Sequence, residues 1–358
     1  MAKQISKNPF AGFGARHVPI IDRVIRNHFD AKVRASRGLL RTINSDLREY
    51  CLRDGKRVRP LLLLLGYRGY CRGGARTGEM AKIAASLELM HSFLLIQDDI
   101  IDRSDLRRGK KTLHVIAGDR FSSYTHNSRV GSDAALVMAD MLMTGSLEII
   151  AGARIDHGVK NRFLRLFAET YERTAYGQIL DILHSLPKKF DNPSIPWEIG
   201  VTKTAYYTMV FPLLMGHLLA GGTGKKEEKR IRDFALPLGL AFQVRDDMLG
   251  VFGRDEKTGK PSSSDLREGK LTFLASDTLE KLTASRRRRF MKLLGAAEKS
   301  PADLREMRLL MLEASAPARS YELLVGLAAE SREKIRHLGM NAAARSALGG
   351  LVDMVGEI

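Results

Sequence analysis

The chain is poor in the residues and segments that mark disulfide-rich and membrane proteins. Its 358 residues include two cysteines, Cys51 and Cys71, and one tryptophan. Because neither cysteine belongs to a metal-type or redox-type pair, we expect two buried thiols in a reducing compartment. No apolar run reaches the roughly 18 residues that would suggest a membrane span. Residues 1–19 are mildly basic and lack the apolar segment of a secretory signal, so we expect a cytoplasmic protein, with a transit peptide as the open alternative.

The chain also lacks a Pro/Ser-rich linker, so we expect one domain over residues 1–358. Alternating β-type runs are few, and the apolar residues recur with helical periodicity, which predicts an all-α bundle. We expect Pro237 to kink or interrupt a helix, and the prolines of 187–196 to break the chain firmly. Loops rich in Gly, Ser and Asn are expected at 117–130 and 253–269. The predicted helices span residues 16–30, 34–53, 57–72, 78–101, 131–153, 158–185, 197–221, 225–252, 271–281, 286–298, 301–313, 317–338 and 342–356.

Basic residues outnumber acidic residues and are spread along the whole chain. There are 58 Lys and Arg against 41 Asp and Glu, a formal net charge of +17. The spread of the basic residues argues against a dedicated nucleic-acid patch. The densest run, four arginines at 286–289, opens an apparently amphipathic helix. We interpret it as a solvated helix start, with a weak contact to anionic lipid as the second reading and nucleic acid as the last.

Two short acidic stretches carry the strongest chemical signal. The first is Gln97-Asp98-Asp99-Ile100-Ile101-Asp102, and the second is Gln243-Val244-Arg245-Asp246-Asp247-Met248-Leu249-Gly250. On a helix, Asp98 and Asp102 lie one above the other, where two carboxylates repel unless a cation lies between them. All-oxygen ligands suit Mg²⁺, which keeps several waters and bridges to substrate phosphates. Two such stretches, each followed by basic residues, predict a diphosphate site rather than a solvated acidic helix end.

Candidate anion ligands lie near the first stretch. Lys56 and Arg59 precede an apolar helix whose first turn holds Pro60, and anions bind well at helix starts. His91 lies two turns before Asp98 on a similar face, where a satisfied core histidine remains the bland alternative. Arg107 and Arg108 are adjacent and therefore point in different directions, which would suit two anions. A bare helix start and an exposed basic loop stay open as alternatives for these two segments.

In order, spacing and context, these segments resemble the trans-isoprenyl diphosphate synthases, the family of farnesyl, geranylgeranyl and longer polyprenyl diphosphate synthases. The resemblance covers roughly residues 50–275 and leaves about 1–15 as an N-terminal extension. It implies a helical bundle of the isoprenoid-synthase type with a central cavity, and a homodimer. The matching segments are GKRVRP (55–60), LELMHSFLLIQDDIIDRSDLRRGKKTLH (87–114), GQILD (177–181), KTAYYT (203–208) and AFQVRDDMLGVFGRDEKTGKPSSSDLREGKLTFL (241–274).

The resemblance implies a role for each matched residue in joining isopentenyl diphosphate to an allylic diphosphate. About three Mg²⁺ ions would be held by Asp98 and Asp102, supported by Asp99, and by Asp246. The allylic diphosphate would be bound by Arg107, Lys203 and Lys260, with Lys270 at the rim. Isopentenyl diphosphate would be bound by Lys56, Arg59, His91 and Arg108. Thr204 and Gln243 would line the reacting carbons, and Gln178 would lie near the same cavity.

The sequence departs from the family pattern at position 250, where the second motif ends in Gly instead of Asp. This change removes an expected outer contact to the third ion. Product length would depend on the residues before the first motif, Phe93 and Leu94. One aromatic there, with no insertion inside DDIID, resembles geranylgeranyl diphosphate synthases. We therefore favour a C20 product and keep C15 and longer chains open, as well as Phe93 being simply a core residue.

Three other functions compete with this hypothesis. A class I terpene cyclase would share the first motif, but it would not need the second group of diphosphate ligands. A non-catalytic subunit of a heteromeric synthase is supported only by Gly250, and the first-motif aspartates argue against it. Nucleic-acid binding rests on net charge alone. We expect a Mg²⁺-dependent prenyltransferase with no nucleic-acid partner.

Overall fold

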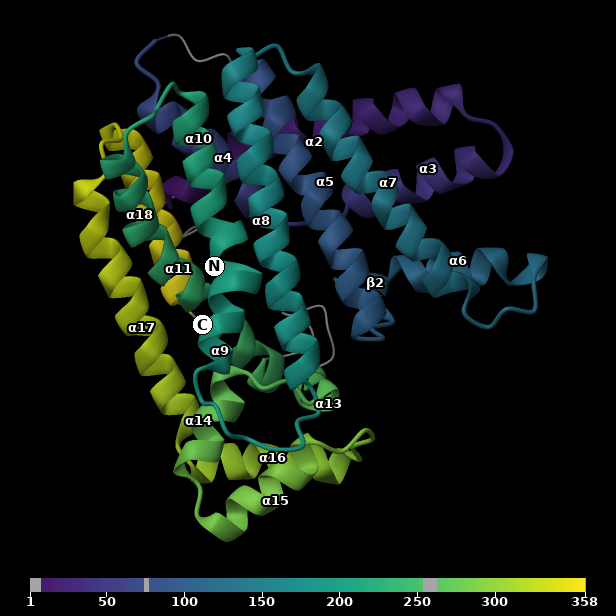
Figure 1. Cartoon of the computed structure of the whole chain (residues 1–358), viewed down its shortest axis with the longest axis vertical. Coiled ribbons are helices and arrows are strands. Elements are labelled where there is room, and N and C mark those ends of the chain that lie inside the picture. The colour runs from purple at the N-terminus through teal and green to yellow at the C-terminus, as the bar shows by residue number, and fades with distance from the viewer. Residues whose placement is uncertain (1–7, 74–76, 254–262, 358) are drawn as a thin grey trace. The chain divides into compact units, whose positions relative to one another are not determined.

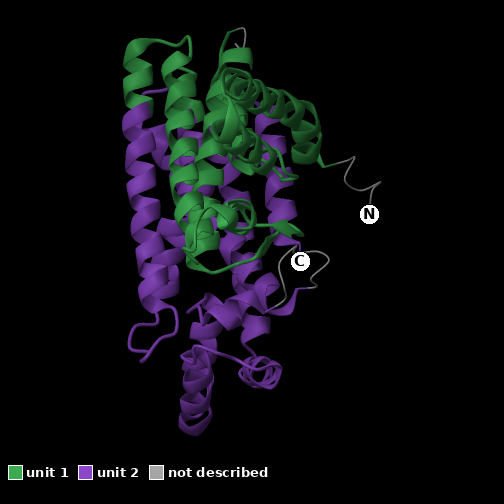
Figure 2. Ribbon diagram, turned by 90° about the vertical axis from the view of Figure 1, so that its right-hand side faces the viewer, with its two compact units in different colours: residues 1–163, 216–221 green, residues 164–215, 222–358 purple. Residues whose placement is uncertain are grey.

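The computed structural model describes residues 8–73, 77–253 and 263–357. They divide into two compact units, coloured green and purple in Figure 2, and each is described by itself. Unit 1 comprises Met1–Phe163 and Gly216–Gly221, and unit 2 comprises Leu164–Met215 and Gly222–Ile358. The described residues are almost entirely helical, as Figure 1 shows, and the all-α expectation is confirmed.

Unit 1 is organised around α5 (Thr77–Ile101), which is buried along most of its length. It packs against α2, α4 and α7, and Ser146 on α7 donates a hydrogen bond of 2.8 Å to the Ser86 carbonyl on α5. Since α5 is surrounded by other helices, it can be apolar nearly all round and still end in partly exposed carboxylates. The other elements of unit 1 are α2 (Pro9–Ala35), α3 (Gly38–Cys51), α4 (Val58–Tyr70), β1 (Leu106–Arg107), β2 (Lys110–Lys111), α6 (Leu113–Phe121), η1 (Ser122–Tyr124), α7 (Val130–Gly152), the start of α8 (His157–His184) and the end of α10 (Phe211–Leu219).

Unit 2 is organised around α11 (Lys225–Phe252), which packs against the π-helical segment η2 (Gly200–Val210), α17 and α18. Gly239 on α11 lets this packing become close, because a Cβ there would lie 2.5 Å from the Cα of Ala205 on η2. Unit 2 also contains the rest of α8 and α10, α9 (Ile195–Ile199), α13 (Ser264–Glu268), α14 (Phe273–Lys281), α15 (Ala284–Leu294), α16 (Pro301–Glu313), α17 (Ala316–Lys334), η3 (Ile335–His337) and α18 (Ala342–Gly356).

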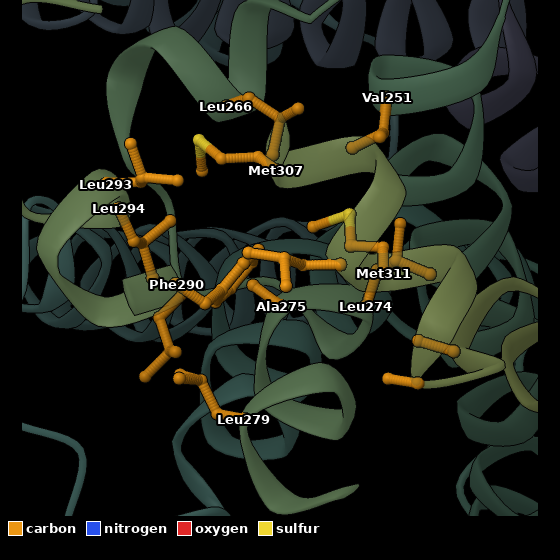
Figure 3. Packing of buried hydrophobic residues seen from close by; sticks show 14 of the residues in the cluster. Val251, Leu266, Leu274, Ala275, Leu279, Phe290, Leu293, Leu294, Met307 and Met311 are labelled. Carbon is orange, nitrogen blue, oxygen red and sulfur yellow. The ribbon is translucent and has the colours of Figure 1, made fainter. Parts of the chain in front are cut away.

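An apolar cluster in unit 2 packs around the C-terminal end of α11. Val251 packs there with Leu266 of α13 and Leu274 of α14, and Phe290, Met307 and Met311 of α15 and α16 complete the cluster (Figure 3). Most of these side chains are fully buried. The cluster therefore anchors the short helix α13 beside the second acidic motif.

The structure differs from the sequence expectations at several local points. The expected loop at 117–130 overlaps the end of α6, and the expected loop at 253–269 contains α13. The expected helix 197–221 is divided among α9, η2 and α10. Pro237, expected to kink or interrupt a helix, lies within a continuous α11, so the helix is not interrupted there. Cys51 is buried as expected, whereas Cys71 is only partly buried.

The expectation that no uninterrupted apolar run is long enough to span a membrane holds, but one helix passes a test by overall length and composition. Helix α7 is long and apolar enough by length and composition, with a mean hydropathy of 1.6 over its most apolar stretch. A continuous apolar run is absent because Asp133, Asp140 and Glu148 interrupt the helix. The core helix of a soluble protein passes the same test. In unit 1, α7 packs against α5 and α6.

Candidate active site

The first acidic motif forms the C-terminal end of α5. The helical turn continues past Ile101, because the Asp102 N–H donates to the Asp98 carbonyl at 2.8 Å. Asp98 and Asp102 therefore lie one turn apart on one face, as the sequence predicted. The Asp98 side chain is 20% exposed, whereas that of Asp99 is 1% exposed. The two adjacent aspartates thus face different surroundings.

The buried carboxylate of Asp99 is hydrogen-bonded to other side chains of the protein. Its carboxylate accepts two hydrogen bonds from Nε of Arg107, at 2.7 and 2.9 Å, and one from the Tyr50 hydroxyl at 3.1 Å. Arg107 also reaches Asp98, with Nη2 3.2 Å from Oδ2. A buried carboxylate bonded in this way holds a guanidinium in a defined orientation. Asp99 therefore aligns Arg107 beside the partly exposed carboxylate of Asp98.

Arg107 and Arg108 are presented by a two-residue hairpin. Strand β1 pairs with β2 so that Arg107 lies opposite Lys110, and the turn residues Arg108 and Gly109 have φ of 54° and 72°. Two central residues with positive φ match the twist of a tight hairpin. The turn directs Arg108 elsewhere than Arg107, and Nη1 of Arg108 donates to the Asp54 carbonyl at 2.5 Å. A Cβ on Gly55 would lie 2.5 Å from the same nitrogen, so this glycine allows the contact.

The expected isopentenyl diphosphate ligands lie in unit 1 around the start of α4. Lys56 is exposed and Arg59 is partly buried, on either side of the buried Arg57. His91 is buried on α5. Burial lowers the pKa of His91 well below its usual range, and the positive charges of Arg59 and Arg108 lower it further. A neutral imidazole between cations can donate one hydrogen bond to an anion without adding to the local repulsion.

The second acidic motif repeats the division seen in the first. Asp246 is exposed on α11, whereas Asp247 is 3% exposed. Asp247 accepts a hydrogen bond of 2.7 Å from the Gln243 side chain and one of 3.0 Å from the Phe273 N–H, at the start of α14. Burial raises the pKa of Asp247 well above its usual range, and the nearby Asp265 carboxylate raises it further. Asp247 thus orients Gln243 and accepts the first N–H of α14, whereas Asp246 is exposed.

Gly250 is in close contact with a carboxylate from another helix. An added Cβ at Gly250 would lie 2.3 Å from Oδ2 of Asp265, near the start of α13. The Ser263 N–H also donates to the Gly250 carbonyl at 2.9 Å. In this chain the space that an aspartate at position 250 would enter is therefore filled by the side chain of Asp265.

Lys203 and Thr204 lie on the π-helical segment η2. The Lys203 ammonium is 2.5 Å from Oδ2 of Asp181, which is 8% exposed on α8. The two elements approach closely at Gly177, where a Cβ would lie 2.4 Å from the backbone nitrogen of Lys203. π-Helical turns often occur at functional sites. Thr204 is partly buried beside Lys203.

The remaining predicted residues have different surroundings. Lys270 pairs with Glu268 at 2.7 Å, with both side chains largely buried. Phe93 is 2% exposed on α5, and Leu94 is partly buried. Gln178 is partly buried on α8. Lys260 lies outside the described residues.

The carboxylates fit magnesium in the kind of donor they provide. Asp98, Asp102 and Asp246 all supply oxygen. Within residues 8–73, 77–253 and 263–357, no three His, Cys, Asp or Glu side chains are arranged to hold a metal by themselves. Mg²⁺ usually binds through one or two carboxylates, several waters and the phosphates of a substrate. The carboxylates of each unit are therefore donors of a kind that would take magnesium together with a diphosphate.

Four residues of this site were missed by the sequence analysis: Tyr50, Arg57, Asp181 and Asp265. Tyr50 contacts Asp99 over 49 positions of sequence, and Lys203 contacts Asp181 over 22. Arg57, Asp181 and Asp265 had a local signal, since they belong to the quoted segments GKRVRP, GQILD and 241–274, whereas Tyr50 lies outside them. The contacts that give these residues their roles follow from no spacing rule.

Comparisons with known proteins place the chain in a family. The family model described as polyprenyl synthetase matches residues 41–311. A geranylfarnesyl diphosphate synthase from Aeropyrum pernix is 33% identical over 73% of this chain and 77% of its own length. A geranylgeranyl diphosphate synthase from Saccharolobus solfataricus is 31% identical over 70% of both chains. The crystal structure of a geranylgeranyl pyrophosphate synthase from Corynebacterium glutamicum, complexed with isoprenyl diphosphate and magnesium, has a TM-score of 0.86, with 24% identity over 94% of this chain and 98% of that one.

The helical fold and the two aspartate motifs define the class first: an all-α trans-prenyltransferase. The chain belongs to the polyprenyl synthetase family. Its activity is that of a trans-prenyl diphosphate synthase. The relatives make products of different lengths, so family membership defines the reaction and leaves the product length open.

Proposed function

We propose that this enzyme condenses isopentenyl diphosphate head-to-tail with an allylic diphosphate, and that its main product is geranylgeranyl diphosphate. The observation that carries the proposal is the end of α5, where Asp98 and Asp102 lie one turn apart beside Arg107. This arrangement can bind a metal–diphosphate unit through carboxylate oxygens and a guanidinium at once. Family membership supports the reaction type.

The proposed metal ligands are Asp98, Asp102 and Asp246. A relative of the same fold was crystallised with magnesium, which supports the same metal here. Magnesium bound there would neutralise the allylic diphosphate and stabilise it as a leaving group. We expect about three ions, as the family resemblance implies.

The side chains of this protein would act on the two substrates separately. Arg107 and Lys203, held by Asp99 and Asp181, would bind the allylic diphosphate together with Lys260, and Lys270 would lie at the rim. The carboxylates of Asp99 and Asp181 keep these two cations in place before the substrate binds. Isopentenyl diphosphate would be bound by Lys56, Arg59, His91 and Arg108.

Carbon–carbon bond formation follows from this division. The allylic carbon–oxygen bond breaks, and the positive charge on the allyl group is stabilised by Thr204 and Gln243. The double bond of isopentenyl diphosphate attacks the cation, and loss of a proton to the departing pyrophosphate completes a five-carbon extension. Holding the two diphosphate substrates in a fixed relative orientation removes much of the entropic cost of bringing them together.

The test is an extension assay with labelled isopentenyl diphosphate, each allylic diphosphate in turn, and Mg²⁺, followed by sizing of the product alcohols. The wild type should give a discrete C20 product that disappears with a chelator. Asp98→Ala should lower kcat by roughly 10³-fold while the circular dichroism spectrum is unchanged, because it removes a metal ligand. Asp119→Ala, at an exposed carboxylate on α6 paired with Lys111, is the matched control and should retain activity. Full activity of Asp98→Ala would disprove the metal assignment.

Product length is proposed to depend on Phe93. Its ring is buried on α5, five positions before Asp98, which supports a role in bounding the growing chain. Phe93→Ala should therefore shift the product from C20 to longer chains, read directly from the sized alcohols. Phe29→Ala, a similarly buried ring on α2, is the control and should leave the length unchanged. An unchanged C20 product from Phe93→Ala would make Phe93 an ordinary core residue.

We further propose that the enzyme is a cytoplasmic homodimer. Two cysteines without a disulfide suit a reducing compartment. The outer face of α7 exposes Leu136, Val137 and Leu147, at 48%, 62% and 41% of their surface. An apolar face of this kind is suited to burial against a second copy.

A further inference from the structure

Arg57 lies between two proposed substrate ligands but does not face solvent. It precedes the first residue of α4, with Lys56 before it and Arg59 two positions after it. Its residue exposure is 5%, and its backbone has φ of 47°. A non-glycine residue in the left-handed region is strained, and such strain persists where the surrounding structure holds it in place. The contacts of the Arg57 side chain provide that support.

The guanidinium of Arg57 makes four hydrogen bonds to three parts of unit 1. Nη1 donates to Glu88 on α5 at 2.7 Å, and Nε donates to Asp22 on α2 at 3.0 Å. Nη2 donates to the carbonyls of Cys51 and Arg53, at the end of α3, both at 3.0 Å. We call Arg57, Asp22 and Glu88 the Arg57 cluster. A planar guanidinium is the one side chain that can bond in several directions at once in this way.

The Arg57 cluster connects, through the backbone, the residues that are proposed to bind isopentenyl diphosphate. On the α4 side, Arg57 fixes the turn that carries Lys56 and Arg59. On the α5 side, Glu88 lies three residues before His91, and residues three apart share a helix face. The cluster therefore fixes the turn bearing two of the proposed isopentenyl diphosphate ligands against the helix bearing a third.

The fourth ligand lies beside the cluster. A small pocket, about 10 Å³, is lined by Arg57, Glu88, Arg107 and Arg108 among others. The Arg57 cluster has one positive and two negative groups, so its formal charge is −1. That charge opposes the mutual repulsion of the neighbouring cations before an anion binds. The cluster thus contributes both geometry and electrostatics to the same anion site.

We propose that the Arg57 cluster positions Lys56, Arg59 and His91 for the diphosphate of isopentenyl diphosphate, without itself contacting the substrate. The inference rests on the proposed function of those ligands. Arg57, Glu88 and Asp22 are positioning residues, and we expect the allylic diphosphate site to depend on them much less, because Asp99 holds its ligand Arg107. A purely structural ion cluster would affect stability and both substrates alike.

The test separates the two substrates. Arg57→Lys keeps the charge but cannot reach four acceptors, and Glu88→Gln keeps the shape but removes the charge. Each variant should raise KM for isopentenyl diphosphate about tenfold or more, with KM for the allylic substrate changed less than about twofold. Calorimetry with isopentenyl diphosphate should show the same loss of affinity. Ile25→Val, which trims a fully buried side chain on α2 near Asp22, controls for lost stability and should leave both KM values unchanged.

The outcomes distinguish the inference from the function it rests on. Equal changes in both KM values, or no change in a folded variant, would overturn the positioning role. Asp22→Asn is the milder substitution if Arg57→Lys does not fold, because the Asp22 side chain is 29% exposed, and the same selective rise in KM is expected. If the wild type binds isopentenyl diphosphate but transfers nothing, the proposed function fails. The calorimetric comparison would then still decide the positioning role.

Discussion

At the scale of single residues, the two acidic motifs divide their work in the same way. In each Asp-Asp pair, the first carboxylate is solvent-accessible and the second is buried and hydrogen-bonded to protein groups. The cause is helical geometry, since adjacent residues point about 100° apart. Asp98 and Asp246, the proposed metal ligands, are thereby the more exposed members, whereas Asp99 and Asp247 hold Arg107 and Gln243. We propose that the first aspartate of each pair binds the metal and that the second supports the neighbouring side chains.

Gly250 shows why a family consensus is not always transferable to one chain. Gly250→Asp would place a Cβ within 2.3 Å of the Asp265 carboxylate and bring two negative charges together. We expect it to destabilise the protein by about 1–3 kcal/mol, through overpacking, and to lower kcat instead of raising it. Thermal unfolding and the extension assay would measure both effects.

The double variant Gly250→Asp with Asp265→Ala tests the explanation. Removing the Asp265 side chain opens the space, so the double variant should be more stable than the sum of the single effects predicts. Additive effects would show that the collision is not what disfavours aspartate at position 250.

At the scale of elements, the close contact of α8 with η2 determines where Lys203 lies. Gly177→Ala would put a methyl group 2.4 Å from the Lys203 backbone nitrogen. Because backbone cannot yield as a flexible side chain can, η2 should shift and the ion pair of Lys203 with Asp181 should be disturbed. We expect kcat to fall about tenfold or more and the melting temperature to decrease, measured by steady-state kinetics and calorimetry.

Gly326→Ala is the matched substitution for this prediction. Gly326 also lies inside a helix, α17, but a Cβ there meets nothing within 4 Å. It should leave kcat unchanged and stabilise the protein by about 0.5–1 kcal/mol, since alanine loses less backbone entropy than glycine. Unchanged kinetics for Gly177→Ala would show that catalysis does not depend on the close packing of α8 against η2.

At the scale of the whole molecule, the exposed apolar face of α7 gives the dimer proposal a direct test. Wild-type protein should sediment with twice the mass of the 39.9 kDa chain. Val137→Glu should shift it toward monomer with an unchanged circular dichroism spectrum, because a two-fold axis brings each new charge to an apolar partner face. Leu309→Glu, at an exposed apolar position on α16, should leave the mass unchanged. A monomeric wild-type protein would disprove the proposed homodimer.

Much of the architecture and the chemistry was determined by the sequence itself. Helical periodicity predicted most helices, including the two that carry the motifs, because burial of one face needs only local spacing. The pattern of Asp98 and Asp102 with Arg107 and Arg108 predicted a metal–diphosphate site. The helix predictions are confirmed because helix geometry is a local property, and the metal–diphosphate site stays a prediction. The same reasoning missed α6, the hairpin and α13, which are short and lack a clear period.

The tertiary structure alone decided which residues hold the ligands in place. Asp99 meets Tyr50, Arg57 joins α2 to α5, and Asp265 fills the space at Gly250, all through contacts between segments far apart in sequence. Such contacts depend on how elements pack, and packing in three dimensions leaves no periodic trace along the chain. The sequence therefore determined the chemistry of the site, and the fold determined the positions and charge states of the groups that carry it out.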